Sequence, residues 1–187
     1  MLFLGGLILS SVLGTGTFPS PFEPDTVTEA YFAANQTATL VAGIMYVIAA
    51  LPLITFVSAI ARGRFAGLAR TGGFVAAAAI AASGLVNITI VAANATGDAL
   101  HTLHYLAFLT GGLIHVPALG LLLGAGTAAL TPSAPLWTTI LGYAAAASAL
   151  LSISGFVTEA TMMLLPLGRF TGILWIVITA TRLARGK

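Results

Sequence analysis

The sequence predicts an all-α, polytopic membrane protein with six transmembrane helices in a bundle and both termini in the cytoplasm. Only seven basic and five acidic residues occur among 187. This is 6% charged, against about 25% in soluble domains. Hydrophobic residues make up 58% of the chain, and the mean hydropathy is +1.05. A soluble protein needs a mostly polar surface, and twelve charged residues are too few to supply it. The composition therefore excludes a soluble globular domain, a disordered chain and a nucleic-acid-binding protein.

Six apolar stretches have about the length that a helix needs to cross the hydrocarbon core of a bilayer. In chain order they cover residues 1–18, 37–61, 71–93, 102–125, 136–157 and 165–181. Proline, glycine or charged residues separate them. The stretches are too long and too rich in alanine and leucine for the strands of a membrane barrel. We therefore expect residues 1–187 to form a single transmembrane domain.

The first two elements need separate justification. Residues 1–18 contain four glycines and lack the basic lead of a signal peptide, so we expect a retained helix and a start site further upstream. Thr26 and Glu29 have the spacing of a capping box, which predicts a helix beginning near Thr26. That helix either continues into the second span or lies on the outer surface and bends near Asn35.

Charge placement predicts the orientation. With the N-terminus inside and six spans, six of the seven basic residues are cytoplasmic and all five acidic residues are external, as the positive-inside rule requires. The expected inner residues are Arg62, Arg64, Arg70, Arg182, Arg185 and Lys187, and the expected outer acids are Glu23, Asp25, Glu29, Asp98 and Glu159. Only Arg169 is a base on the outer side. This pattern predicts a multi-pass protein of the inner or plasma membrane.

The three histidines lie on or beside the fourth span, at His101, His104 and His115. At about 100° per residue, an unbroken α-helix places them on one stripe, with His115 roughly 16 Å below His104. Asn87 on the third span lies at an intermediate depth. Ionisable groups are costly at membrane depth and are therefore candidates for function. The opposing interpretation is structural, with interfacial histidines near water and His115 hydrogen-bonded to a neighbouring helix.

This stripe could bind two kinds of cofactor, although we expect none. A metal ion such as zinc could be held by His101 and His104, with Asp98, Glu159 or Glu29 completing the site. A haem would need a second axial ligand, because His104 and His115 are too far apart to share one iron. The available second ligands are Met45, Met162, Met163 or a residue of another subunit.

Glu159 and Arg169 flank the outer loop between the fifth and sixth spans. An unpaired arginine inside the membrane costs up to about 3 kcal/mol, and pairing with Glu159 would lower that cost. We expect a structural ion pair, with a proton or substrate relay as the alternative.

Enzyme motifs are missing from the sequence. There is no phosphate-binding loop, no Gly-x-Ser-x-Gly and no His-Glu-x-x-His. The absence of cysteine excludes disulfides and thiolate chemistry. The sequence therefore favours a protein that is not an enzyme.

Two segments carry a resemblance to a known group. Residues 103–116 read LHYLAFLTGGLIHV and residues 164–175 read LLPLGRFTGILW. They resemble a class of small multi-span bacterial membrane proteins catalogued as a domain of unknown function, and the layout of most of the chain is similar. The resemblance implies a helical integral membrane protein without an assigned activity, and it matches at His104, His115 and Arg169. The chain departs from the pattern at its N-terminus, where the basic lead is missing.

Three classes of function follow from these observations. The first is a structural or accessory subunit that packs against other membrane subunits, or against copies of itself, within the lipid bilayer. The second is a small transporter or channel with a polar site near His104 and His115. The third is a metal- or cofactor-binding membrane protein that uses the outer end of the fourth span.

Overall fold

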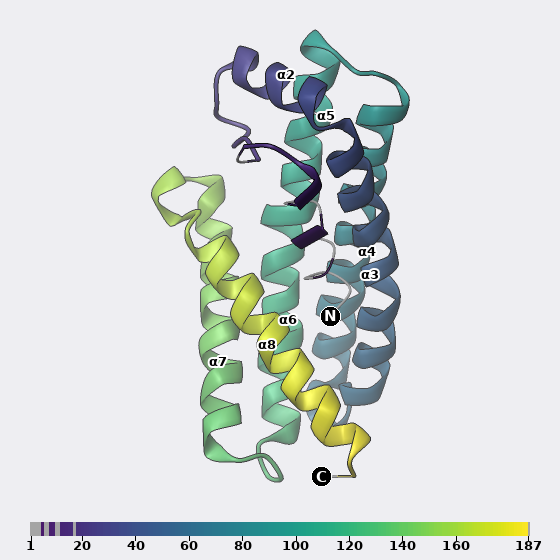
Figure 1. The fold of residues 1–187 in the computed structure, drawn as a ribbon. Coiled ribbons are helices and arrows are strands. Elements are labelled where there is room, and N and C mark those ends of the chain that lie inside the picture. The colour runs from purple at the N-terminus through teal and green to yellow at the C-terminus, as the bar shows by residue number, and fades with distance from the viewer. Residues whose placement is uncertain (1–4, 6–7, 10–11, 17, 187) are drawn as a thin grey trace. The chain divides into compact units, whose positions relative to one another are not determined.

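The computed structural model describes residues 5, 8–9, 12–16 and 18–186 (Figure 1). All regular elements within this part of the chain are helical. Five of its helices are long and apolar enough to cross a membrane. Half of the predicted first span, 1–18, falls on residues outside the described ones, as do both chain ends. The six-span count and the cytoplasmic termini therefore stay predictions.

The five candidate spans agree closely with the stretches expected from the sequence. They are Gln36–Ile60, Gly63–Ala92, Gly97–Leu130, Leu136–Phe156 and Leu164–Ala184. The named elements are α2 (Asp25–Ala34), α3 (Gln36–Ile60), η1 (Gly63–Phe65), α4 (Ala66–Ala92), α5 (Gly97–Phe108), η2 (Leu109–Ile114), α6 (His115–Leu130), α7 (Leu136–Leu151), η3 (Ser152–Phe156), η4 (Glu159–Thr161) and α8 (Leu164–Ala184).

The second of these spans begins several residues earlier than the predicted stretch 71–93. Gly63 adopts a positive φ of 68°, a conformation that glycine reaches without steric cost. The chain turns at this residue and enters η1 and then α4 directly. Arg64 and Arg70 therefore lie on the helical span, and both are exposed. Long arginine side chains can reach from such positions to the membrane surface.

The helix predicted near Thr26 begins one residue earlier, at Asp25. The capping box itself does not form, because Pro24 is the N-cap and no side chain caps α2. We expected this helix either to continue into the second span or to bend near Asn35, and the structure shows a break in the helix at Asn35. Its side chain accepts a hydrogen bond from the Thr15 N–H (2.7 Å) and donates to the Tyr31 carbonyl (2.9 Å).

The span around the histidines is not a continuous α-helix. Between α5 and α6 it contains the π-helical segment η2, and Pro117 follows in the first turn of α6. Proline has no N–H and clashes with the carbonyl four residues before it. A wider π turn next to the proline relieves this clash. The regular 100° steps on which the prediction of one histidine stripe depends therefore do not continue through this segment.

The described part of the chain divides into two compact units, residues 1–50 with 79–111 and residues 51–78 with 112–187. In the first unit, α2 lies beside α5 (Figure 1), and α3 approaches α4 through Gly43 and Gly84. A β-carbon on Gly43 would lie 2.7 Å from the Gly84 carbonyl oxygen, so both positions need glycine. The Ser83 hydroxyl of α4 donates to the Ala107 carbonyl of α5 (2.8 Å).

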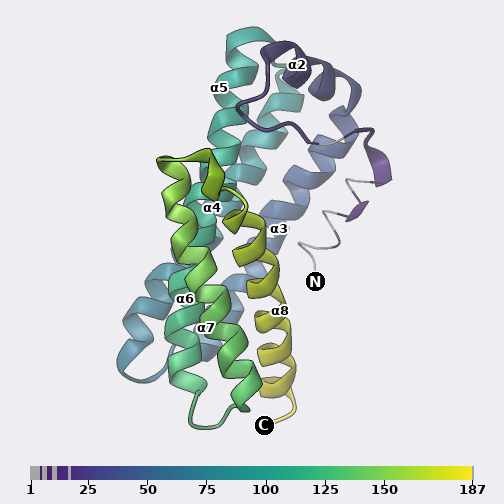
Figure 2. The same cartoon turned by 90° about the vertical axis from the view of Figure 1, so that its left-hand side faces the viewer.

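In the second unit, α6, α7 and α8 lie side by side (Figures 1 and 2). Small residues form the contacts. A β-carbon on Gly168 of α8 would lie 2.6 Å from the Ala149 Cα of α7, and Ala149 is fully buried. Trp175 of α8 is also buried, with its ring 6.1 Å from that of Phe56 of α3. Close contact through glycine and alanine is the association expected for helices in lipid.

Candidate functional site

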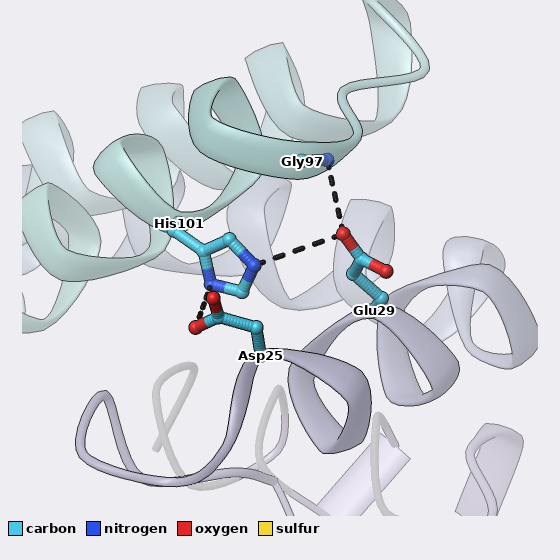
Figure 3. Close-up of polar contacts among 4 residues, drawn as sticks. All are labelled: Asp25, Glu29, Gly97 and His101. Carbon is cyan, nitrogen blue, oxygen red and sulfur yellow. Dashed lines mark hydrogen bonds and ion pairs between the residues drawn. The ribbon is translucent and has the colours of Figure 1, made fainter.

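His101 is held between two carboxylates of α2 (Figure 3). Its Nδ1 lies 3.4 Å from an Asp25 oxygen, and its Nε2 lies 3.8 Å from Glu29 Oε1. Asp25 and Glu29 are four residues apart, which places them on one face of α2. The longer distance exceeds hydrogen-bond range, so Glu29 acts on the ring by charge alone. Both contacts are ion pairs only when the imidazole is protonated.

Glu29 has a second partner in the same unit. Its Oε1 accepts a hydrogen bond from the Gly97 N–H at 3.2 Å (Figure 3). Gly97 is the first residue of α5 and has a φ of 53°. A carboxylate at a helix N-terminus is stabilised by the helix dipole. Glu29 therefore joins α2 to the start of α5 instead of capping its own helix.

His104 is enclosed by aromatic rings. The ring centroids of Phe18 and Phe32 lie 5.4 and 5.2 Å from its own, both edge-to-face. His104 is only 2% exposed, and its Nε2 finds no hydrogen-bond partner among the described residues. Tyr31 packs against the same two phenylalanines. Burial, with the nearby Tyr46, raises the pKa of the Tyr31 hydroxyl.

His115 lies in the second unit and has a structural partner. Its Nδ1 is 2.8 Å from the Ala76 carbonyl oxygen of α4, and the side chain is buried. A carbonyl oxygen only accepts, so Nδ1 carries the proton in this contact. The guanidinium of Arg169 acts electrostatically on the same imidazole. This arrangement agrees with the structural interpretation of His115.

The other predicted site residues of the first unit are Asn87 and Asp98. Asn87 of α4 is 4% exposed, and its Oδ1 has no hydrogen-bond partner among the described residues. Asp98 is exposed in the first turn of α5. No ion pair joins Asp98 to His101 or His104 in the part of the chain that the structure describes. The Glu159 side chain lies outside the described set, so its pairing with Arg169 stays a prediction.

No group of three or more histidine, aspartate or glutamate side chains able to hold a metal ion occurs among the described residues. His101 has its two carboxylates on α2, whereas the zinc hypothesis paired it with His104. Of the acids named in that hypothesis, Glu29 contacts His101. Figure 3 shows the Asp25 and Glu29 carboxylates on His101.

The described residues enclose two cavities that were not predicted from the sequence. One, of about 480 Å³, belongs to the first unit and lies between α2 and the segment that joins α4 to α5. Its apolar wall includes Phe32, Ile90 and Leu100, which form a buried cluster. Glu29 and Asn94 are among its polar lining residues. The pairing of α2 with that segment creates this cavity, and no motif marks it.

The other cavity, of about 20 Å³, belongs to the second unit and is lined by threonines of three helices. They include Thr127 of α6, Thr138 of α7 and Thr179 of α8. A threonine in an apolar helix ordinarily bonds the carbonyl four residues before it. The sequence therefore gave no reason to group these three.

A scan against protein-family models found no match to this chain, and searches of curated proteins and of solved structures found none either. The resemblance to small multi-span bacterial membrane proteins therefore stays a prediction.

Proposed function

We propose that this chain is a multi-pass protein of a bacterial inner or plasma membrane, without enzymatic activity, that serves as a structural or accessory subunit of a membrane complex. The observation that carries the proposal is the engagement of His115 with the Ala76 carbonyl (2.8 Å). This histidine, the deepest predicted, holds two helices together. Its Nδ1 proton is committed to that contact.

The outer surface of α7 supports the same proposal. Large apolar side chains are exposed along one stripe of this helix, at the three- and four-residue spacing of a single helix face. They are Leu136, Ile140, Tyr143, Leu150 and Leu151. The opposite face carries Gly142, Ala145 and Ala149, which are buried. The exposed stripe suits lipid or the helix of another subunit, including a second copy of this chain.

Site-specific crosslinking tests this proposal. The chain has no cysteine, so Ile140→Cys offers a single attachment point for a photo-crosslinker on α7. Leu85→Cys is the matched control on α4, with similar exposure (57% against 59%). We expect Ile140→Cys in native membranes to give one discrete product of defined mass, and Leu85→Cys to give none. The proposal is wrong if neither gives a discrete product and native mass spectrometry after gentle solubilisation shows only single chains.

A second candidate function rests on the larger cavity of the first unit. Its volume of about 480 Å³ falls in the range of small-molecule sites, which are mostly apolar with a few polar groups. The cavity would bind a small amphipathic molecule, as the transporter alternative requires. Ala33 lines it, so Ala33→Trp should fill it, whereas Ala34→Trp alters a neighbouring exposed position.

Mass spectrometry of small molecules extracted from the purified protein measures this binding. We expect a molecule that is retained by the wild type and by Ala34→Trp but lost from Ala33→Trp. Equal retention by all three proteins, or retention by none, would count against the second candidate.

A further inference from the structure

We propose that the small cavity between α6, α7 and α8 is a binding site for a monovalent anion such as chloride. The cavity holds about 20 Å³, which is room for one water-sized species. All its lining residues belong to the second unit. The proposal is independent of the subunit function above, because it concerns the interior of that unit.

Unpaired hydroxyl groups are the first argument. Thr127, Thr138 and Thr179 are between 2% and 4% exposed, and their hydroxyls have no hydrogen-bond partner among the described residues. A buried polar group left without a partner costs about 1–3 kcal/mol. Three such groups around one cavity indicate that a bound species supplies the hydrogen-bond partners that the protein does not.

The neighbouring acceptors are already occupied. The Thr127 carbonyl accepts from the N–H and the hydroxyl of Thr131, at 2.9 and 2.8 Å. The Leu130 carbonyl accepts from the N–H groups of Ser133 and Ala134. The Ser133 carbonyl accepts from Arg182 at 3.2 Å. A group that receives hydrogen bonds would therefore serve the threonine hydroxyl protons together with the Arg182 guanidinium, which can only donate.

The charge around the cavity favours an anion. Arg182 lines it, and its second terminal nitrogen, Nη1, has no hydrogen-bond partner among the described residues. The described lining residues include no carboxylate. Thr138 lies in the first turn of α7, whose N-terminus has no side-chain cap. The positive end of that helix dipole therefore adds to the charge of Arg182.

Gly142 provides space at the same place. A β-carbon on this residue would lie 2.5 Å from the Trp175 indole nitrogen and would also contact the Thr127 hydroxyl. These two donor groups therefore converge on one point beside α7. The Trp175 indole N–H only donates hydrogen bonds. It is a further group that an anion would satisfy.

A single water molecule fits this arrangement less well. Water accepts about two hydrogen bonds and must donate two of its own. A water can donate to threonine hydroxyl oxygens as well as accept from their protons, but a neutral water leaves the charge of Arg182 unbalanced. A chloride ion accepts from the threonine and arginine donors and also balances the charge of Arg182.

Tryptophan fluorescence of the full chain in detergent micelles tests the proposal. The chain has two tryptophans, and Trp137 is exposed, so Trp137→Phe leaves Trp175 as the only reporter. Sodium bromide is titrated against sodium gluconate at constant ionic strength. We expect saturable quenching that sodium chloride competes away.

Variants in the same background identify the site. Thr138→Val with Thr179→Val removes two unpaired hydroxyls without removing a hydrogen bond, so the protein should still fold. It should raise the half-saturating bromide concentration about tenfold or more, because bonds to charged groups are stronger than average. Thr171→Val is the control, since that hydroxyl bonds the Leu167 carbonyl on an exposed face of α8. It should leave the curve unchanged.

Arg182→Gln should also weaken binding. Linear quenching that chloride does not affect, with the same slope in the double threonine variant, would show that the cavity holds water only and would overturn the proposal. An equal loss of binding in Thr171→Val would overturn the assignment to this cavity.

Discussion

Replacing Gly168 by alanine tests the close contact between α7 and α8. The new β-carbon would lie 2.6 Å from the Cα and 2.7 Å from the N of Ala149. Both are backbone atoms, so the two helices must separate. Such overpacking costs about 1–3 kcal/mol, whereas alanine gains up to about 1 kcal/mol over glycine in helix propensity. The net loss of unfolding free energy should be up to about 2 kcal/mol.

Gly124→Ala is the matched control in the same unit. Its β-carbon would meet only the Ala146 Cβ, at 3.6 Å, which is an ordinary van der Waals contact. The propensity gain should therefore stabilise this variant by up to about 1 kcal/mol. Unfolding by sodium dodecyl sulfate in mixed micelles, followed by circular dichroism, measures both. The reasoning fails if Gly168→Ala is as stable as Gly124→Ala.

Three further predictions follow from the site and the topology. His115→Phe removes the imidazole donor from the Ala76 carbonyl, which keeps its bond within the helix, and should lower the unfolding free energy by about 0.5–1.5 kcal/mol, measured by the same assay; unchanged stability would contradict the assigned hydrogen bond. The raised pKa of Tyr31 means that the folded state holds this proton more tightly than the unfolded state. The contribution of Tyr31 to the unfolding free energy is therefore present below pH about 10 and is lost as the pH rises through its pKa in the folded state. Tyr31→Phe should flatten the dependence of stability on pH in this range, and an unaltered curve would refute this. Single cysteines at Arg62 and Asp98 should react with a membrane-impermeant maleimide from opposite sides of the membrane, and reaction from one side only would reject the charge-based topology.

Much of the helical layout was predictable because length and hydropathy act over whole spans. The stretch 37–61 corresponds to α3 and 136–157 to α7 with η3, each within one residue. The early start of the span at Gly63 was missed, because an arginine-rich turn looks like a loop when its glycine conformation is unknown. Half of the first stretch, 1–18, lies outside the described residues, and this span stays a prediction.

The candidate site was harder to predict, because its geometry depends on local departures from regular helix. The π segment before Pro117 invalidated the 100° spacing on which the histidine stripe depended. Only the contact between His115 and a neighbouring helix was anticipated, as one of two interpretations. Asp25 was not expected beside His101. Glu29, named in the zinc hypothesis, does contact His101, but it was also expected to cap its own helix and instead receives the Gly97 N–H.

The threonine cavity shows the same limit. Thr127, Thr138 and Thr179 lie in three different helices, and nothing in the spacing of the sequence relates them. Only the packing of α6, α7 and α8 brings their hydroxyls to one cavity.

The short connection between α6 and α7 has a consequence for biosynthesis. Only the segment from Thr131 to Pro135 separates these helices, and α7 has the lower hydropathy, 1.5 against 1.9 for the span containing α6. We therefore expect the translocon to release α6 and α7 together as a helical hairpin. In this hairpin, α6 shields the Thr138 hydroxyl of α7 from the acyl chains of the lipid. A glycosylation reporter placed after α7 should show less complete integration when α6 is deleted.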